Sequence, residues 1–218
     1  MKETGVIFNT AMVQADLDGR KTNTRRTRGL EKINQYPDQW LCDGKMNDNG
    51  LFTFASDQFH KEIDVKCPYG QPGDLIYVRE TWKPELVNRE GKAYSYYYLA
   101  DNPQAKSTVN KFKPSIHMPK EAARIWKKII SVRPERLQDI SNEDAIAEGI
   151  RCKTCRISGE TGYLAPNRTD NAKFESAVKA FKSLWRSING PDSWEANPWV
   201  WRIEYEIIST TSRPQILP

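Results

Sequence analysis

The chain has 218 residues, 28% of them charged, and its mean hydropathy is −0.73. No apolar run approaches the roughly 20 residues that a membrane-spanning helix needs, and the first residues lack the apolar segment of a signal peptide. We therefore expect a cytoplasmic protein that does not enter a membrane. The net charge of +5 is only a mild bias toward polyanionic ligands, weaker than that of a typical dedicated DNA-binding domain.

The first half of the chain contains mostly short apolar segments separated by turn signals. Residues 5–8 predict a strand, and residues 9–18 predict a helix that ends at Gly19. Residues 29–50 are predicted to be irregular. Further strands are expected at residues 51–54, 63–67, 75–78 and 94–99, because these stretches are rich in β-branched and aromatic residues.

The second half contains the clearest helices. A strand is expected at residues 124–133, then a helix within 136–150 with Ser141 as N-cap and Gly149 as terminator. Residues 152–169 are expected to form a polar insertion. A helix at 174–188 and an alternating strand at 199–208 follow, and 209–218 are expected to be a disordered tail. The fold class predicted is α+β, a β-barrel with peripheral helices in a single domain over residues 1–208.

The segment from residue 20 to residue 26 holds four cationic side chains and two hydroxyls, and Gly19 before it permits a tight turn. Arg20, Arg25 and Arg26 are forked donors that suit a phosphate or a nucleobase. Lys21 would lose its proton more easily if it were buried beside these cations, and it could then act as a base. Thr24 would supply a nucleophilic hydroxyl. The alternative is a basic turn that only binds phosphate or faces solvent.

Other side chains are weaker candidates for the same site. Glu80 follows the strand at 75–78, and it would either line a ligand pocket or pair with Arg25 or Arg79. Trp82 and Tyr69 could stack on a base, although aromatic residues are more often part of the core.

The cysteines leave one metal site open. Cys152 and Cys155 form a single C-x-x-C pair, and Cys42 and Cys67 are isolated. These four could together hold a structural zinc ion, but two C-x-x-C pairs would be needed for a strong zinc signal. We therefore expect no metal or cofactor.

The segment Gly19-Arg20-Lys21-Thr22-x-Thr24-x-Arg26 resembles the signature of ASCH domains, which have a PUA-like β-barrel. Pro72-Gly73-Asp74, the helix that ends at Glu148-Gly149 and the closing aromatic strand follow in the family's order. The chain is most similar to the longer phage and prophage members, with insertions at about 30–62, 83–113 and 151–173.

Small bacterial ASCH proteins are amidohydrolases that remove the acetyl group from N4-acetylcytidine. The resemblance implies that their catalytic Lys, Thr and Glu correspond to Lys21, Thr24 and Glu148. It therefore implies an amidohydrolase for an N4-acylated cytidine-type nucleoside, with Thr24 as nucleophile and Lys21 and Glu148 for acid–base work. Two other functions stay open: a protein that binds RNA or a modified base without catalysis, and a ribonuclease.

Overall fold

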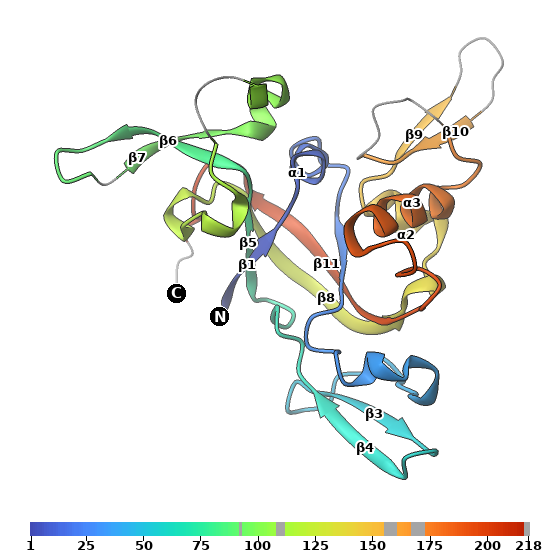
Figure 1. Cartoon of the computed structure of the whole chain (residues 1–218). Coiled ribbons are helices and arrows are strands. Elements are labelled where there is room, and N and C mark those ends of the chain that lie inside the picture. Colours follow the sequence, from blue (N-terminus) through green and yellow to red (C-terminus); the bar gives the residue numbers. More distant parts are fainter. Residues whose placement is uncertain (92, 108–111, 155–160, 167–172, 216–218) are drawn as a thin grey trace.

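Figure 1 shows the computed structural model, which describes residues 1–91, 93–107, 112–154, 161–166 and 173–215. A five-stranded mixed sheet lies at its centre, in the order β1-β5-β8-β11-β2. Only β1 and β5 pair in parallel; the other neighbours are antiparallel. The bounds of the strands are β1 Glu3–Ile7, β2 Asn23–Arg26, β5 Leu75–Arg79, β8 Trp126–Arg136 and β11 Trp199–Ser209.

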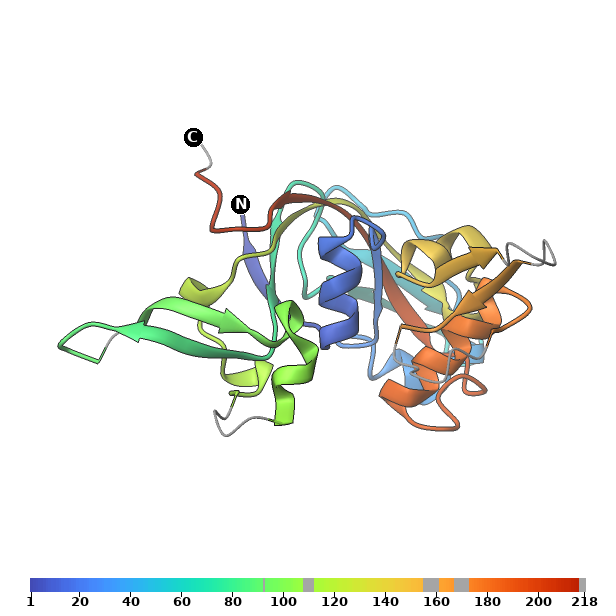
Figure 2. The same ribbon diagram turned by 90° about the horizontal axis from the view of Figure 1, so that it is seen from above.

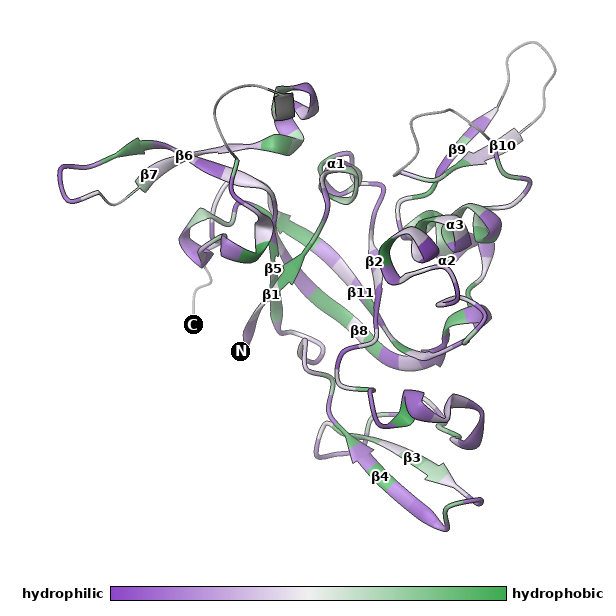
Figure 3. Cartoon of the chain, in the orientation of Figure 1, coloured by the Kyte–Doolittle hydropathy of each residue, from purple (hydrophilic) through white to green (hydrophobic). Residues whose placement is uncertain are grey.

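The long strands β8 and β11 form the spine of this sheet, and they pair along their length. Alternating residues of β11 are buried, because successive side chains of a strand point to opposite faces. The inward face carries Trp199, Trp201, Ile203 and Tyr205, which join the main hydrophobic cluster. Figure 3 shows a hydrophilic stretch along β2 in the middle of the molecule, where an apolar strand would be usual.

In the described part of the chain, three α-helices lie against the sheet, each with a polar side chain that caps its N-terminus. They are α1 Thr10–Leu17, α2 Asn142–Ala147 and α3 Ala177–Asn189, capped by Asn9, Ser141 and Ser176. Helix α3 is amphipathic, and it buries Ala180, Phe181, Leu184 and Trp185 in a second cluster. Seen from above, α1 stands in the middle of the molecule, with α2 and α3 to one side (Figure 2).

Three hairpins extend from this centre in different directions (Figure 1). They fall largely within the three insertions that the sequence predicts. They pair β3 Phe52–Ser56 with β4 Lys61–Val65, β6 Trp82–Val87 with β7 Ala93–Tyr98, and β9 Arg151–Thr154 with β10 Thr161–Leu164. In the parts of the chain described, no helix is long and apolar enough to cross a membrane.

The structure confirms the α+β class, and it corrects several finer predictions. The edge strands β1 and β2 are not paired with each other, so the central sheet is open over the described residues and the predicted barrel is not confirmed. The helix expected within 136–150 is much shorter, because β8 continues to Arg136 and α2 begins only at Asn142. The basic segment contains a strand, β2, and the polar insertion contains the β9–β10 hairpin. Residues 210–215 contain no helix or strand, and 216–218 lie outside the described residues.

Candidate functional site

A pocket of about 170 Å³ lies between β2 and helix α3. One wall is polar and comes mainly from the basic segment, and the other is apolar and comes from α3. The residues that line it are Met12, Thr24, Arg25, Arg26, Thr27, Arg28, Tyr69, Glu148, Phe181, Leu184, Trp185, Ile188 and Asn189. Three predicted binding residues, Arg25, Arg26 and Tyr69, therefore meet here with two predicted catalytic residues, Thr24 and Glu148.

Lys21 lies just beneath this pocket, with no exposed surface. The chain turns at Gly19, where φ is +68°, and the backbone N–H of Lys21 then donates to the carbonyl of Ala15 in α1. Its ammonium donates to three oxygens: Asn23 O at 2.7 Å, Glu148 O at 3.0 Å and Glu148 Oε2 at 2.6 Å. Burial lowers the pKa of Lys21, because an ammonium loses its hydration there, while the carboxylate of Glu148 opposes this shift.

Glu148 joins Lys21 to the pocket. It is the C-cap residue of α2 and is 2% exposed. Its Oε1 accepts from Arg25 at 3.3 Å, and its Oε2 accepts from Lys21. The next residue, Gly149, has a φ of +100°, and a Cβ there would lie 2.9 Å from the Cβ of Ala15. Only glycine therefore lets α2 end so close to α1 and bring Glu148 onto Lys21.

Thr24 lies on β2, where it pairs with Ile203 of β11, and its side chain lines the pocket. Within the described residues its hydroxyl makes no hydrogen bond to another protein group, so it is free to meet a ligand. Lys21 and Thr24 are not hydrogen-bonded to each other, since the three donors of Lys21 are directed to Asn23 and Glu148. The group that reaches the pocket beside Thr24 is Glu148, with Lys21 behind it.

The arginines of the basic segment have different surroundings. The guanidinium of Arg25 is buried and forms ion pairs with Glu135, Asp144 and Glu148, at 2.6, 2.9 and 3.3 Å. Arg26 donates to the carbonyl of Ile7 and lies over the ring of Phe8.

Arg20 points away from this pocket. It pairs with Asp18, donates to the carbonyl of Gly149 and lines a separate, smaller pocket with Arg151. Among the predicted binding arginines, Arg25 and Arg26 thus belong to the site and Arg20 does not.

Glu80 and Trp82 also lie apart from this pocket. Both carboxylate oxygens of Glu80 accept from Arg124, at 2.9 and 3.1 Å, so neither expected partner, Arg25 or Arg79, is used. Burial raises the pKa of Glu80, and Arg124 opposes that shift. Trp82 belongs to a third hydrophobic cluster and lines a different pocket, along the β6–β7 hairpin.

Two features of the site were not predicted from the sequence. The apolar wall from α3 was predicted only as a helix with one buried face, and periodicity does not say which part of that face borders a pocket. The second is a buried pair of Asp16 and Lys127 close to Lys21. The signal for Lys127 is weak: it lies next to the apolar Trp126 on a strand that otherwise alternates.

Of the four cysteines considered as an alternative zinc site, three lie within the described residues. Cys42 is half-buried, Cys67 is buried and Cys152 is exposed, all with free thiols, and Cys155 lies outside the described residues. Burial raises the pKa of Cys67 to about 11, which disfavours the thiolate that a metal needs. Among the residues described, no group of three or more His, Cys, Asp or Glu side chains is placed to hold a metal ion.

Comparisons of this chain with protein-family models, with curated proteins and with solved structures found no match.

Proposed function

We propose that the protein is an amidohydrolase that removes the acyl group from an N4-acylated cytidine-type nucleoside. The observation that carries this proposal is the arrangement of Thr24, Glu148 and Lys21 at one pocket. The Thr24 hydroxyl has no hydrogen-bond partner in the described chain, Glu148 lines the same pocket, and Lys21 donates to that carboxylate from below. The ASCH membership and the PUA-like architecture belong to the same proposal, because they rest on the sequence resemblance.

The reaction needs a nucleophile, a proton acceptor and donors for the developing oxyanion. Thr24 Oγ attacks the acyl carbon, and its proton passes to the Lys21–Glu148 pair. The C–N bond then breaks, and the leaving nitrogen takes that proton. Water attacks the acyl-threonine ester, releases the carboxylic acid and restores the Thr24 hydroxyl. The charges at the rim of the pocket, on Arg26 and the exposed Arg28, would attract the nucleoside or hold the oxyanion.

Lys21 and Glu148 act together as one base, because a proton can lie on either side of the hydrogen bond between them. Glu148 faces the pocket, and Lys21 Nζ lies 2.6 Å from its Oε2. Burial lowers the pKa of Lys21, so this lysine loses its proton more easily than an exposed one and can exchange a proton with Glu148. The apolar side chains of Phe181, Leu184 and Trp185 would exclude water on the opposite wall and pack against the base or the acyl group.

The test is incubation of the purified protein with N4-acetylcytidine, followed by chromatography for cytidine. Thr24→Ala should abolish turnover, since no acyl-enzyme can form. Thr22→Ala is the matched control, because Thr22 is exposed in the same segment and is bound through its backbone. Turnover that survives Thr24→Ala would exclude the Thr nucleophile.

A second candidate is a protein that binds RNA or a modified base without catalysis. It is favoured by one observation: the Lys21 ammonium already has three acceptors, as in a structural ion pair. This function predicts no cytidine release, together with RNA binding that weakens with salt and in Arg28→Ala. Metal-independent cleavage of RNA that persists in Thr24→Ala would instead support the ribonuclease.

A further inference from the structure

A second buried lysine–carboxylate pair lies beside the proposed catalytic pair. Lys127 of β8 and Asp16 of α1 have no exposed side-chain surface, and Lys127 Nζ is 2.7 Å from Asp16 Oδ2. The other oxygen of Asp16 accepts from the hydroxyl of Tyr205 on β11, at 3.1 Å. Replacing such a buried pair by apolar residues often leaves the stability of a protein unchanged or improved. We therefore look for a role of this pair other than stability.

The ring of Phe8 connects the two pairs. Lys127 Nζ lies 4.0 Å from its centre, Lys21 Nζ lies 5.4 Å from it, and the guanidinium carbon of Arg26 lies 5.2 Å from it. Lys127 also lies 3.8 Å from the centre of the Tyr205 ring. Two ammonium groups therefore lie close to one buried phenyl ring, where charges are screened far less than at the surface.

Charged and titratable groups reach this cluster from every element that packs on it. Asp16 comes from α1, Lys21 from the turn after it and Arg26 from β2, and Tyr205 comes from β11. Glu148 at the end of α2 acts on Lys21 and Tyr205, and Glu80 after β5 is within reach of the charge on Asp16. Among these, Lys127 is the nearest charge to Asp16 and has no place in the pocket itself.

We propose that Lys127 and Asp16 are positioning residues that set the protonation of the Lys21–Glu148 pair, and so the pH range of the proposed hydrolysis. The proposal rests on the proposed function. A positive Lys127 disfavours a proton on Lys21, whereas a negative Asp16 favours it. Burial lowers the pKa of Lys127 to about 7, so the charge of Lys127 changes near neutral pH, and burial also raises the pKa of Asp16.

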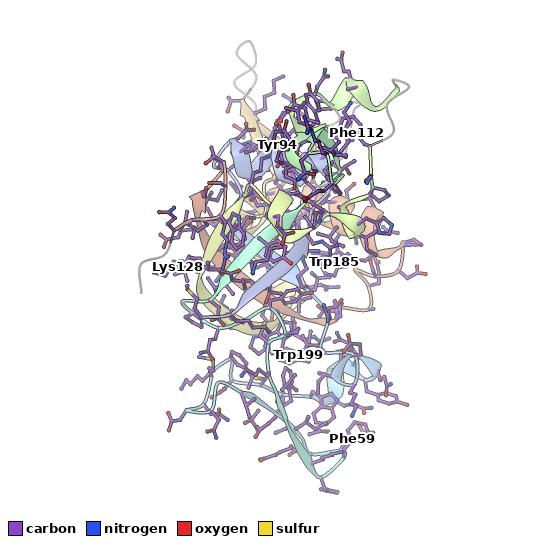
Figure 4. The ribbon with its side chains drawn as sticks, turned by 90° about the vertical axis from the view of Figure 1, so that its left-hand side faces the viewer. Phe59, Tyr94, Phe112, Lys128, Trp185 and Trp199 are labelled. Atoms are coloured by element: carbon purple, nitrogen blue, oxygen red, sulfur yellow. The ribbon has the colours of Figure 1, made fainter. Side chains whose placement is uncertain are left out.

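The first experiment measures the pH dependence of kcat for cytidine release. A base must lose its proton to work, so activity rises as pH increases through the pKa of the Lys21–Glu148 pair. Lys127→Met should move this rise to higher pH by about one unit, because the repelling charge is lost. Asp16→Asn should move it to lower pH, and the double variant should lie between the two. Lys128→Met is the control, since Lys128 is the next residue of the same strand and is exposed (Figure 4).

The second experiment reads the protonation directly and needs no turnover. Carbon-13 NMR of the lysine Cε groups is followed against pH in the full chain, with the signal of Lys21 assigned by its loss in Lys21→Met. The expected result is that the Lys21 titration moves up in Lys127→Met and down in Asp16→Asn. The proposed function fails if the wild type releases no cytidine, whatever the NMR result.

The inference itself is overturned if Lys21 titrates alike in all these variants, or if both single variants shift it in the same direction. Either single variant leaves one buried charge unpaired and could unfold the protein. The double variant removes both charges together, so it keeps the test valid. In this variant the titration of Lys21 should no longer respond to the second pair near pH 7, as it does in the wild type. Persistence of that dependence would also overturn the inference.

Discussion

Glu148 and Glu80 are two carboxylates with almost equal burial, at 2% and 1% exposure, in very different surroundings. Glu80 follows β5 and accepts from Nε and Nη2 of Arg124, whose guanidinium also stacks on Tyr98 and pairs with Asp101. Glu148 caps α2, and one of its oxygens binds a lysine while the other lies 3.3 Å from Arg25. Only Glu148 borders the pocket that contains a free hydroxyl.

The difference shows that burial of an acid does not by itself mark a site. A guanidinium stays protonated at any physiological pH, so the Glu80–Arg124 pair has no proton to exchange. A buried lysine can lose its proton, so the Lys21–Glu148 pair can take one up and return it. The chemical difference between the two regions therefore lies in the partner of the carboxylate and in its access to a ligand.

The largest expected effect is on activity. Glu148→Gln should lower kcat for cytidine release by about 10²–10⁴-fold, because the group that we propose to receive the Thr24 proton is lost. Glu80→Gln makes the same chemical change at the same depth and should alter kcat by no more than a few-fold. Steady-state kinetics on N4-acetylcytidine would measure both. An equal loss of kcat in the two variants would mean that both carboxylates only stabilise the fold and that neither takes part in the reaction.

The next effect is on stability. Arg124→Met leaves Glu80 buried without its partner and should lower the free energy of unfolding by about 3–5 kcal/mol. Lys21→Met should lower the free energy of unfolding by less, since Arg25 still lies 3.3 Å from Glu148. Urea denaturation followed by circular dichroism gives these values.

Arg133→Met is the control for that series, because the side chain of Arg133 is 52% exposed in its pair with Glu135. Its cost should stay below about 1 kcal/mol. The comparison fails if Arg124→Met costs no more than this control.

A smaller effect should come from the backbone that brings Glu148 to Lys21. Gly149→Ala places a Cβ against Ala15 at a φ of +100° and should cost about 2–3 kcal/mol. Gly73→Ala introduces a similar strain, at a φ of +91°, with nothing within 4 Å of the new Cβ, and should cost about 1 kcal/mol. Thermal unfolding of the two variants separates strain from collision. A Gly149 variant as stable as the Gly73 variant would show that α1 and α2 can move apart freely.

The local elements were largely predictable from the residues. Caps and an amphipathic period mark α3, and alternation with β-branched and aromatic residues marks β11. The mixed α+β class follows from such patterns. The exceptions are instructive: β2 is a strand of polar residues, Asn23 to Arg26, and its backbone is placed by pairing with β11 and not by strand propensity. The open edges β1 and β2 likewise depend on pairings between distant segments.

For the site, the motif that contains Gly19 was enough to mark Lys21 and Thr24, and the resemblance added Glu148. The sequence alone thus determined which side chains carry reactive groups and where most of the helices and strands lie, because these depend on residue type and short-range spacing. Tertiary structure alone decided that Glu80 meets Arg124, that α3 forms the apolar wall and that Lys127 is buried on Asp16. Periodicity shows that a face is buried but not what it faces, and the pairing of charges depends on which distant residues then share the same interior.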